Sequence, residues 1–70
     1  MNKRKETSNY IISNIESIIN ENNIKDVESF LSDISGIICR FDTDIAIEVM
    51  NGLGEYGKNQ ALSIKVNYGY

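Results

Sequence analysis

The residue types that most often carry out chemistry are scarce in this 70-residue sequence, which has no histidine and one cysteine, Cys39. A cysteine nucleophile needs a base that activates it and donors that stabilise the developing charge, and no histidine is present as that base. Cys39 lies beside the apolar face of a predicted helix, which favours a partly buried, inert thiol. The alternative is intermolecular oxidation or modification, with Arg40 as the neighbour that would stabilise a thiolate.

The carboxylates do not follow a metal-binding pattern. Zinc sites are built mainly from several Cys and His ligands, which this chain lacks. Asp42-Thr43-Asp44 begins like a calcium loop but lacks the glycine and the closing glutamate at their later positions. Because Asp and Thr are preferred helix caps, we interpret this triplet as the boundary between two helices. We therefore predict no catalytic residue, no metal site and no cofactor.

Three glycines, Gly52-x-Gly54-x-x-Gly57, match the letters of a dinucleotide-binding fingerprint. That motif must follow a strand and open a helix within a βαβ unit. Here it follows the last helical pattern in the chain. We therefore read it as a loosened helix end, followed by a connection at Gly57-Lys58-Asn59-Gln60.

The charges are unevenly distributed. Residues 1–5 carry three basic side chains, residues 6–57 carry two basic and ten acidic ones, and residues 58–70 carry two basic ones. Nucleic-acid binding needs clustered Lys and Arg, so an acidic body argues against it and suits another protein as partner. The basic start at residues 1–6 reads as a solvated tail.

Composition indicates one small globular domain. Apolar residues make up 41% and charged residues 24% of the chain, which is ordinary for a folded protein. A domain of this size is marginally stable, so self-association as a homodimer would help it. One cysteine allows no internal disulfide, and neither a signal peptide nor a membrane span is visible, so we expect a cytoplasmic location. The Ile- and Asn-rich composition is typical of AT-rich genomes and favours a bacterial, phage or plasmid origin.

Apolar residues three and four positions apart predict two helices in the first part of the chain. The first is capped by Thr7 or Ser8. The second is capped by Asn23, with Asp26 completing a capping box. Joined by a short turn, the two helices should pack as an antiparallel pair. The apolar face of the second helix is the broadest in the chain and comprises Ile24, Val27, Phe30, Leu31, Ile34, Ile37, Ile38 and Phe41.

A glycine, Gly36, lies in the middle of that second helix and predicts the close approach of a neighbouring helix. A third helix is predicted from Asp44 to about Tyr56. A strand is the alternative there, because Ile45, Ile47 and Val49 alternate and would pair with the tail as a hairpin. We favour the helix, because it accounts for more of the apolar positions in this segment than a strand does.

The segment Asp44-Ile-Ala-Ile-Glu-Val49 resembles the first helix of the helix-turn-helix in some bacterial transcription activators. In that motif, Ala46 would pack against a recognition helix. The resemblance covers six residues. The glycines and Glu55 that follow it do not supply the side chains that read base edges.

The last residues alternate between apolar and polar or small side chains, which is the pattern of a half-buried strand. A lone strand cannot satisfy its backbone groups, so it would pair with its twin in a dimer, with a sheet edge or with an enzyme groove. We predict that the apolar members contact the partner: Leu62, Ile64, Val66, Tyr68 and Tyr70.

The sequence thus predicts a mainly α fold, with a three-helix domain at 7–57 and an extended or β segment at 58–70. The alternative is an α+β fold in which a helical pair packs on a C-terminal β-hairpin. The predicted function is a protein-binding module that regulates or inhibits a partner. Two alternatives remain: a precursor peptide with an enzyme-modified tail, and a small dimeric DNA-binding regulator.

Overall fold

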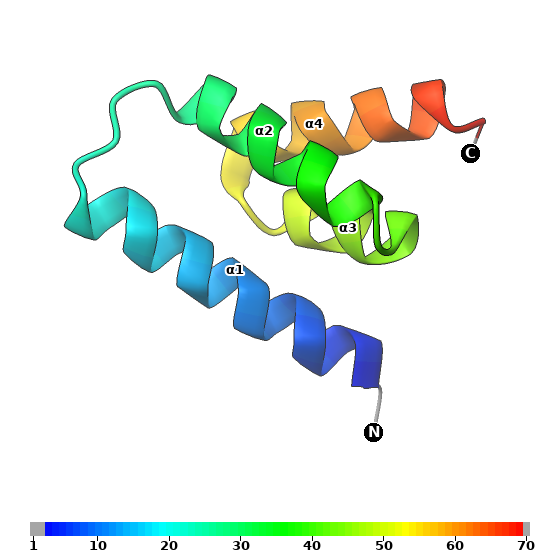
Figure 1. Cartoon of the computed structure of the whole chain (residues 1–70), viewed down its shortest axis with the longest axis horizontal. Helices are drawn as coiled ribbons and strands as arrows, with labels where there is room; N and C mark the ends of the chain where they lie inside the picture. The colour runs from blue at the N-terminus through cyan, green and yellow to red at the C-terminus, as the bar shows by residue number, and fades with distance from the viewer. Residues whose placement is uncertain (1–2, 70) are drawn as a thin grey trace.

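The protein is a bundle of four helices in a computed structural model that describes residues 3–69 (Figure 1). The helices are α1 (Lys3–Glu21), α2 (Val27–Cys39), α3 (Thr43–Asn51) and α4 (Gly54–Asn67). Each helix runs opposite to the one before it, so α1 lies parallel to α3 and α2 parallel to α4. The prediction of a mainly α fold is confirmed. None of the helices within residues 3–69 is long and apolar enough to cross a membrane.

The helix caps follow the predicted chemistry at one boundary and differ at another. Asp42 caps α3 as predicted, because its Oδ1 accepts a hydrogen bond from the backbone N–H of Ile45 at 3.0 Å. At the start of α2, Asp26 is the cap and accepts from the N–H of Ser29 at 3.1 Å. Asn23 is not a cap: its φ of 53° places it in the left-handed region, which asparagine tolerates, and this turns the chain between α1 and α2.

Helix α1 begins earlier than predicted, at Lys3. Thr7 and Ser8 therefore lie inside the helix, and their prediction as caps is wrong. Thr7 Oγ1 donates back to the Lys3 carbonyl at 3.0 Å, a bond that Thr makes within helices. Lysine and arginine are good helix formers, which explains why the basic start at residues 3–6 is helical.

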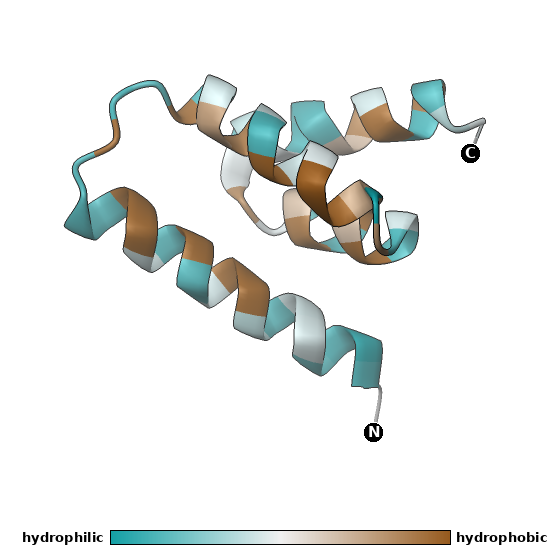
Figure 2. Cartoon of the chain, viewed as in Figure 1, coloured by the Kyte–Doolittle hydropathy of each residue, from teal (hydrophilic) through white to brown (hydrophobic). Residues whose placement is uncertain are grey.

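The core forms around α3, the helix that packs against each of the other three. Its inward side chains are nearly all apolar, and hydrophobic residues also recur along α1 and α2 (Figure 2). The buried apolar residues come from all four helices: Ile15, Leu31, Ala46, Ile47, Val49, Met50, Ala61 and Ile64.

Helix α1 runs antiparallel to α2 as predicted (Figure 1), but it packs mainly on α3, so the predicted packing of the first two helices against each other is wrong. Three contacts between α1 and α3 each join residues that are 40 positions apart in the sequence, which shows that the two helices run in the same direction. The Arg4 guanidinium lies 3.9 Å from the Asp44 carboxylate. Ser8 Oγ donates to Glu48 Oε2 at 3.3 Å. The Ile12 side chain covers the α carbon of Gly52.

The predicted extended or β segment at 58–70 is wrong, because residues 54–67 form α4. The inward face of α4 consists of Gly57, Ala61 and Ile64, which are four and three residues apart and therefore lie on one side of a helix. A Cβ on Gly57 would collide with the Met50 carbonyl oxygen and the Leu53 side chain. Small residues thus let α4 approach α3 closely. The alternative α+β fold with a C-terminal β-hairpin is excluded as well, because residues 43–51 and 54–67 are both helical.

The close approach predicted at Gly36 is absent, since no atom of a neighbouring helix lies within 4 Å of a Cβ built there. The glycine that the close packing of α4 on α3 needs is Gly57. The sequence pattern predicts a connection at Gly57, because glycine weakens helices and its packing role adds no apolar residue to the helical pattern.

We predict opposite effects on stability for two glycine-to-alanine substitutions. Gly57→Ala should lower the free energy of unfolding by about 1–3 kcal/mol, because overpacking outweighs the gain in helix propensity. Gly36→Ala should raise it by up to about 1 kcal/mol, because the added methyl group meets open space. Urea denaturation followed by circular dichroism measures both. Equal effects of the two substitutions would contradict the close packing of α3 and α4.

Candidate protein-binding surface

The buried polar side chains serve to join helices. Ser8 links α1 to Glu48 of α3. Ser35 of α2 donates to the Ser32 carbonyl at 2.8 Å, and its Oγ lies 3.5 Å from Gln60 Oε1 of α4. Every buried side-chain nitrogen or oxygen within residues 3–69 has a partner. These groups therefore hold the fold together.

Cys39 is half-buried, as the sequence predicts, and packs against the core. Burial raises the pKa of its thiol above the ordinary value of 9.0, because desolvation disfavours the thiolate. A thiol must ionise to attack, so this environment opposes nucleophilic chemistry at Cys39.

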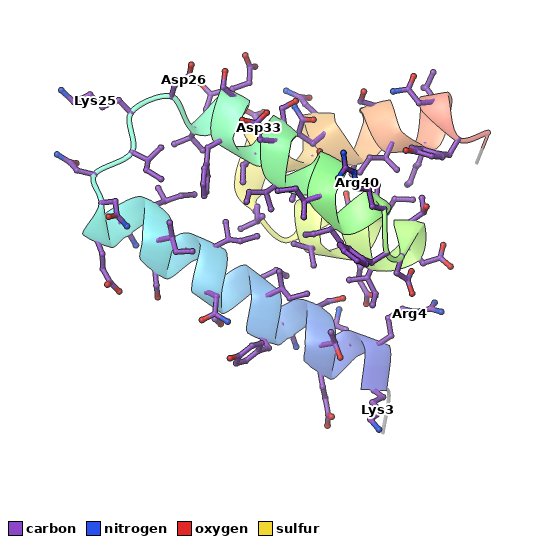
Figure 3. All side chains as sticks on the ribbon, in the orientation of Figure 1. Lys3, Arg4, Lys25, Asp26, Asp33 and Arg40 are labelled. Atoms are coloured by element: carbon purple, nitrogen blue, oxygen red, sulfur yellow. The ribbon has the colours of Figure 1, made fainter. Side chains whose placement is uncertain are left out.

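The acidic and glycine motifs have structural positions. Asp42 caps α3, and Asp44 pairs with Arg4, which lies at the start of α1 (Figure 3). Gly52 ends α3 and Gly54 begins α4, so the three-glycine motif spans a junction between helices. Within residues 3–69, no three Cys, Asp or Glu side chains gather where they could hold a metal ion, and no pocket is found.

The predicted partner-binding residues separate into two groups. Leu62 is 60% exposed, Val66 is 78% exposed and Tyr68, at the end of α4, is 57% exposed. Ile64 is buried in the core, so the structure does not place it on a binding surface. Tyr70 lies outside the described residues.

Leu62 and Val66 form what we call the outer α4 face, together with the lysines beside them, Lys58 and Lys65. Leu62 and Val66 are four residues apart and lie on adjacent turns, opposite the inward face of α4. The four side chains are exposed. Glu55, the one acidic residue of α4, lies seven residues before Leu62 and therefore on the same side of the helix, in its first turn. The two lysines give this face a basic edge on a protein whose body is acidic.

Ile37 and Phe41 form a second exposed apolar pair, and the sequence predicts both on the broad apolar face of α2. Ile37 is 53% exposed and Phe41 is 84% exposed. We call this pair the α2 patch. The width of the apolar face of α2 is the sequence feature that indicates this exposure. An apolar face that extends so far around one helix is wider than the neighbouring helices of a small bundle can cover.

We predict slow, pH-dependent alkylation of Cys39. In the folded protein, the midpoint of the rate against pH should exceed 9.0, and unfolding in urea should restore the ordinary value. Since the folded pKa is raised, the contribution of Cys39 to the free energy of unfolding should be constant below the unfolded pKa. This contribution should fall as pH rises through the interval up to the folded pKa. Denaturation at about pH 7 and about pH 10 measures this.

The control for that experiment is Cys39→Ser, which should lack this part of the fall in stability. If the thiol reacts as fast in the folded protein as in urea, the burial of Cys39 is contradicted.

Two exposed apolar surfaces thus distinguish this bundle: the outer α4 face with its lysines, and the α2 patch near Asp33 and Asp42. Leu62 and Val66 lie on adjacent turns of α4, and Ile37 lies near the end of α2 with Phe41 just beyond that end. Large side chains placed in this way suit contact with another polypeptide. No family model matches the chain, and neither a curated protein nor a solved structure is significantly similar to it.

Proposed function

We propose that this protein is a small binding module that regulates or inhibits another protein through its outer α4 face. The observation that carries the proposal is the exposure of Leu62 and Val66 on adjacent turns of a helix whose inward face is built mainly from small residues. Isolated exposed apolar side chains are ordinary. Large aliphatic side chains aligned on one helix are typical of anchors that enter a groove on a partner.

The mode of recognition follows from the helical backbone. In α4 the backbone N–H and C=O groups bond within the helix, so addition of a strand to a partner's sheet is not available to residues 54–67. Recognition therefore falls to the side chains at i and i+4, Leu62 and Val66. Lys58 and Lys65 at the edge favour a partner whose groove has an acidic rim.

The two alternative functions are less well supported. A precursor peptide needs an extended substrate region, whereas residues 58–67 are helical and contribute Ala61 and Ile64 to the core. A DNA-binding surface needs clustered cations. The basic residues at 3–5 lie on α1, and Lys58 and Lys65 lie on α4, while Arg4 pairs with Asp44. A cytoplasmic location remains part of the proposal, because the one thiol is unpaired and suits a reducing compartment.

The test compares proteins captured from a lysate of the host that encodes this chain. Wild-type protein and the double variant Leu62→Glu/Val66→Glu are immobilised, and the captured proteins are quantified by mass spectrometry. We expect at least one protein to be retained by the wild type and to fall by about tenfold or more with the variant, because two buried anchors become charged.

The matched control is Tyr10→Glu, which changes an exposed aromatic residue on α1 and should leave capture unchanged. Circular dichroism must show equal helicity for all three proteins. Capture that is the same for the wild type and the double variant would remove the outer α4 face as the binding surface.

A further inference from the structure

The α2 patch and the outer α4 face lie on different sides of the molecule. Ser35 faces α4, since its Oγ lies 3.5 Å from Gln60 Oε1. Ile37 is two residues further along the helix, a rotation of about 200°, which places it on the flank of α2 opposite Ser35. The last turn of α2 continues through Arg40, whose N–H bonds to the Ile37 carbonyl, and Phe41 follows directly. The patch therefore faces away from α4.

The charges around the α2 patch oppose those of the outer α4 face. Asp33 lies one turn before Ile37, in the middle of α2, and Arg40 lies at the carboxyl end of that helix (Figure 3). Along the chain, the charged residues that border Ile37 and Phe41 are Asp33, Asp42 and Arg40, whereas α4 contains two lysines and one glutamate. One surface is thus an apolar pair with two acidic neighbours and one basic neighbour, and the other is an apolar pair on a helix with two basic residues and one acidic residue.

The charges of the two surfaces are complementary to each other, whereas two copies of the same surface would bring like charges together. If two outer α4 faces met across a twofold axis, Lys58 and Lys65 of one copy would crowd those of the other. Two α2 patches would bring Asp33 and Asp42 of one copy toward the same residues of the other. A helix with two aliphatic side chains one turn apart and lysines at its edge is the kind of partner that the α2 patch fits, and α4 of a second copy is such a helix.

We infer that this protein associates with itself head to tail, with the outer α4 face of one copy docked on the α2 patch of the next. The contact is heterologous, so each added copy offers a further α4 face and a further α2 patch. The apolar surface involved is small, which makes the association weak and dependent on concentration. Because opposite charges contribute, added salt weakens it further.

The experiment uses purified protein and two double variants at exposed positions. Leu62→Glu/Val66→Glu removes the outer α4 face, and Ile37→Glu/Phe41→Glu removes the α2 patch. Light scattering over a range of concentrations gives the molar mass. We expect the mass of the wild type to rise with concentration beyond that of a dimer, and each variant alone to stay monomeric at the same concentrations.

The decisive measurement is the mixture of the two variants. Each variant keeps the surface that the other has lost, so an equimolar mixture should form a one-to-one dimer that cannot grow. Lys58→Glu/Lys65→Glu, a change confined to exposed lysines, should weaken association of an otherwise intact chain about tenfold or more.

Four results would overturn the inference: a wild-type protein that stays monomeric, one that stops at a dimer, a single variant that still associates, or a mixture that stays monomeric. Capture of a different protein in the lysate experiment is read out separately from the molar mass of the purified chain, so failure of this inference and failure of the proposed function are distinguishable.

Discussion

The burial of α3 is the constraint on which the rest of the structure depends. Five of its nine residues are apolar and point in several directions, so no single neighbour can cover them. One helix must lie on each open side, and α1, α2 and α4 do so. The polar contacts follow from this arrangement. Ser8 meets Glu48, and Arg4 reaches Asp44, because α1 lies parallel to α3 at a fixed offset; the second pair, half-exposed, adds little stability.

The close contact of α3 with α4 determines what remains at the surface. Gly57 leaves no room for a Cβ against the Met50 carbonyl, and Ala61 continues the small face one turn later. The inward face of α4 is thus made mainly of small residues, and the bulky Leu62 and Val66 lie outward. An ordinary amphipathic helix would bury such residues. The reversal links the packing of the core to the proposed binding surface, since the same face could not serve both.

This reversal also explains which parts of the structure could be predicted from the sequence. Bulky apolar residues at helical spacing marked the first three helices, and Asp42 was recognisable as a cap because its chemistry is local. Helix α4 was missed, because Gly57 and Ala61 carry no apolar signal while the outward Leu62 and Val66 alternate with Ile64 as in a strand. The same alternation predicts Leu62, Val66 and Tyr68 as contact residues of a strand, whereas the structure exposes these three side chains on the outer side or at the end of a helix. Ile64 was misplaced for the same reason that the helix was missed.

The proposed binding activity and the inferred self-association would use one surface, and this has a physical consequence. A copy whose outer α4 face is docked on the α2 patch of its neighbour cannot offer Leu62 and Val66 to another protein. The two equilibria therefore compete, and the affinity for a partner falls as the concentration of this protein rises. The terminal copy of each assembly keeps its α4 face open. A weak self-contact thus leaves most copies available at low concentration and withholds them at high concentration, without any change in the fold of the bundle.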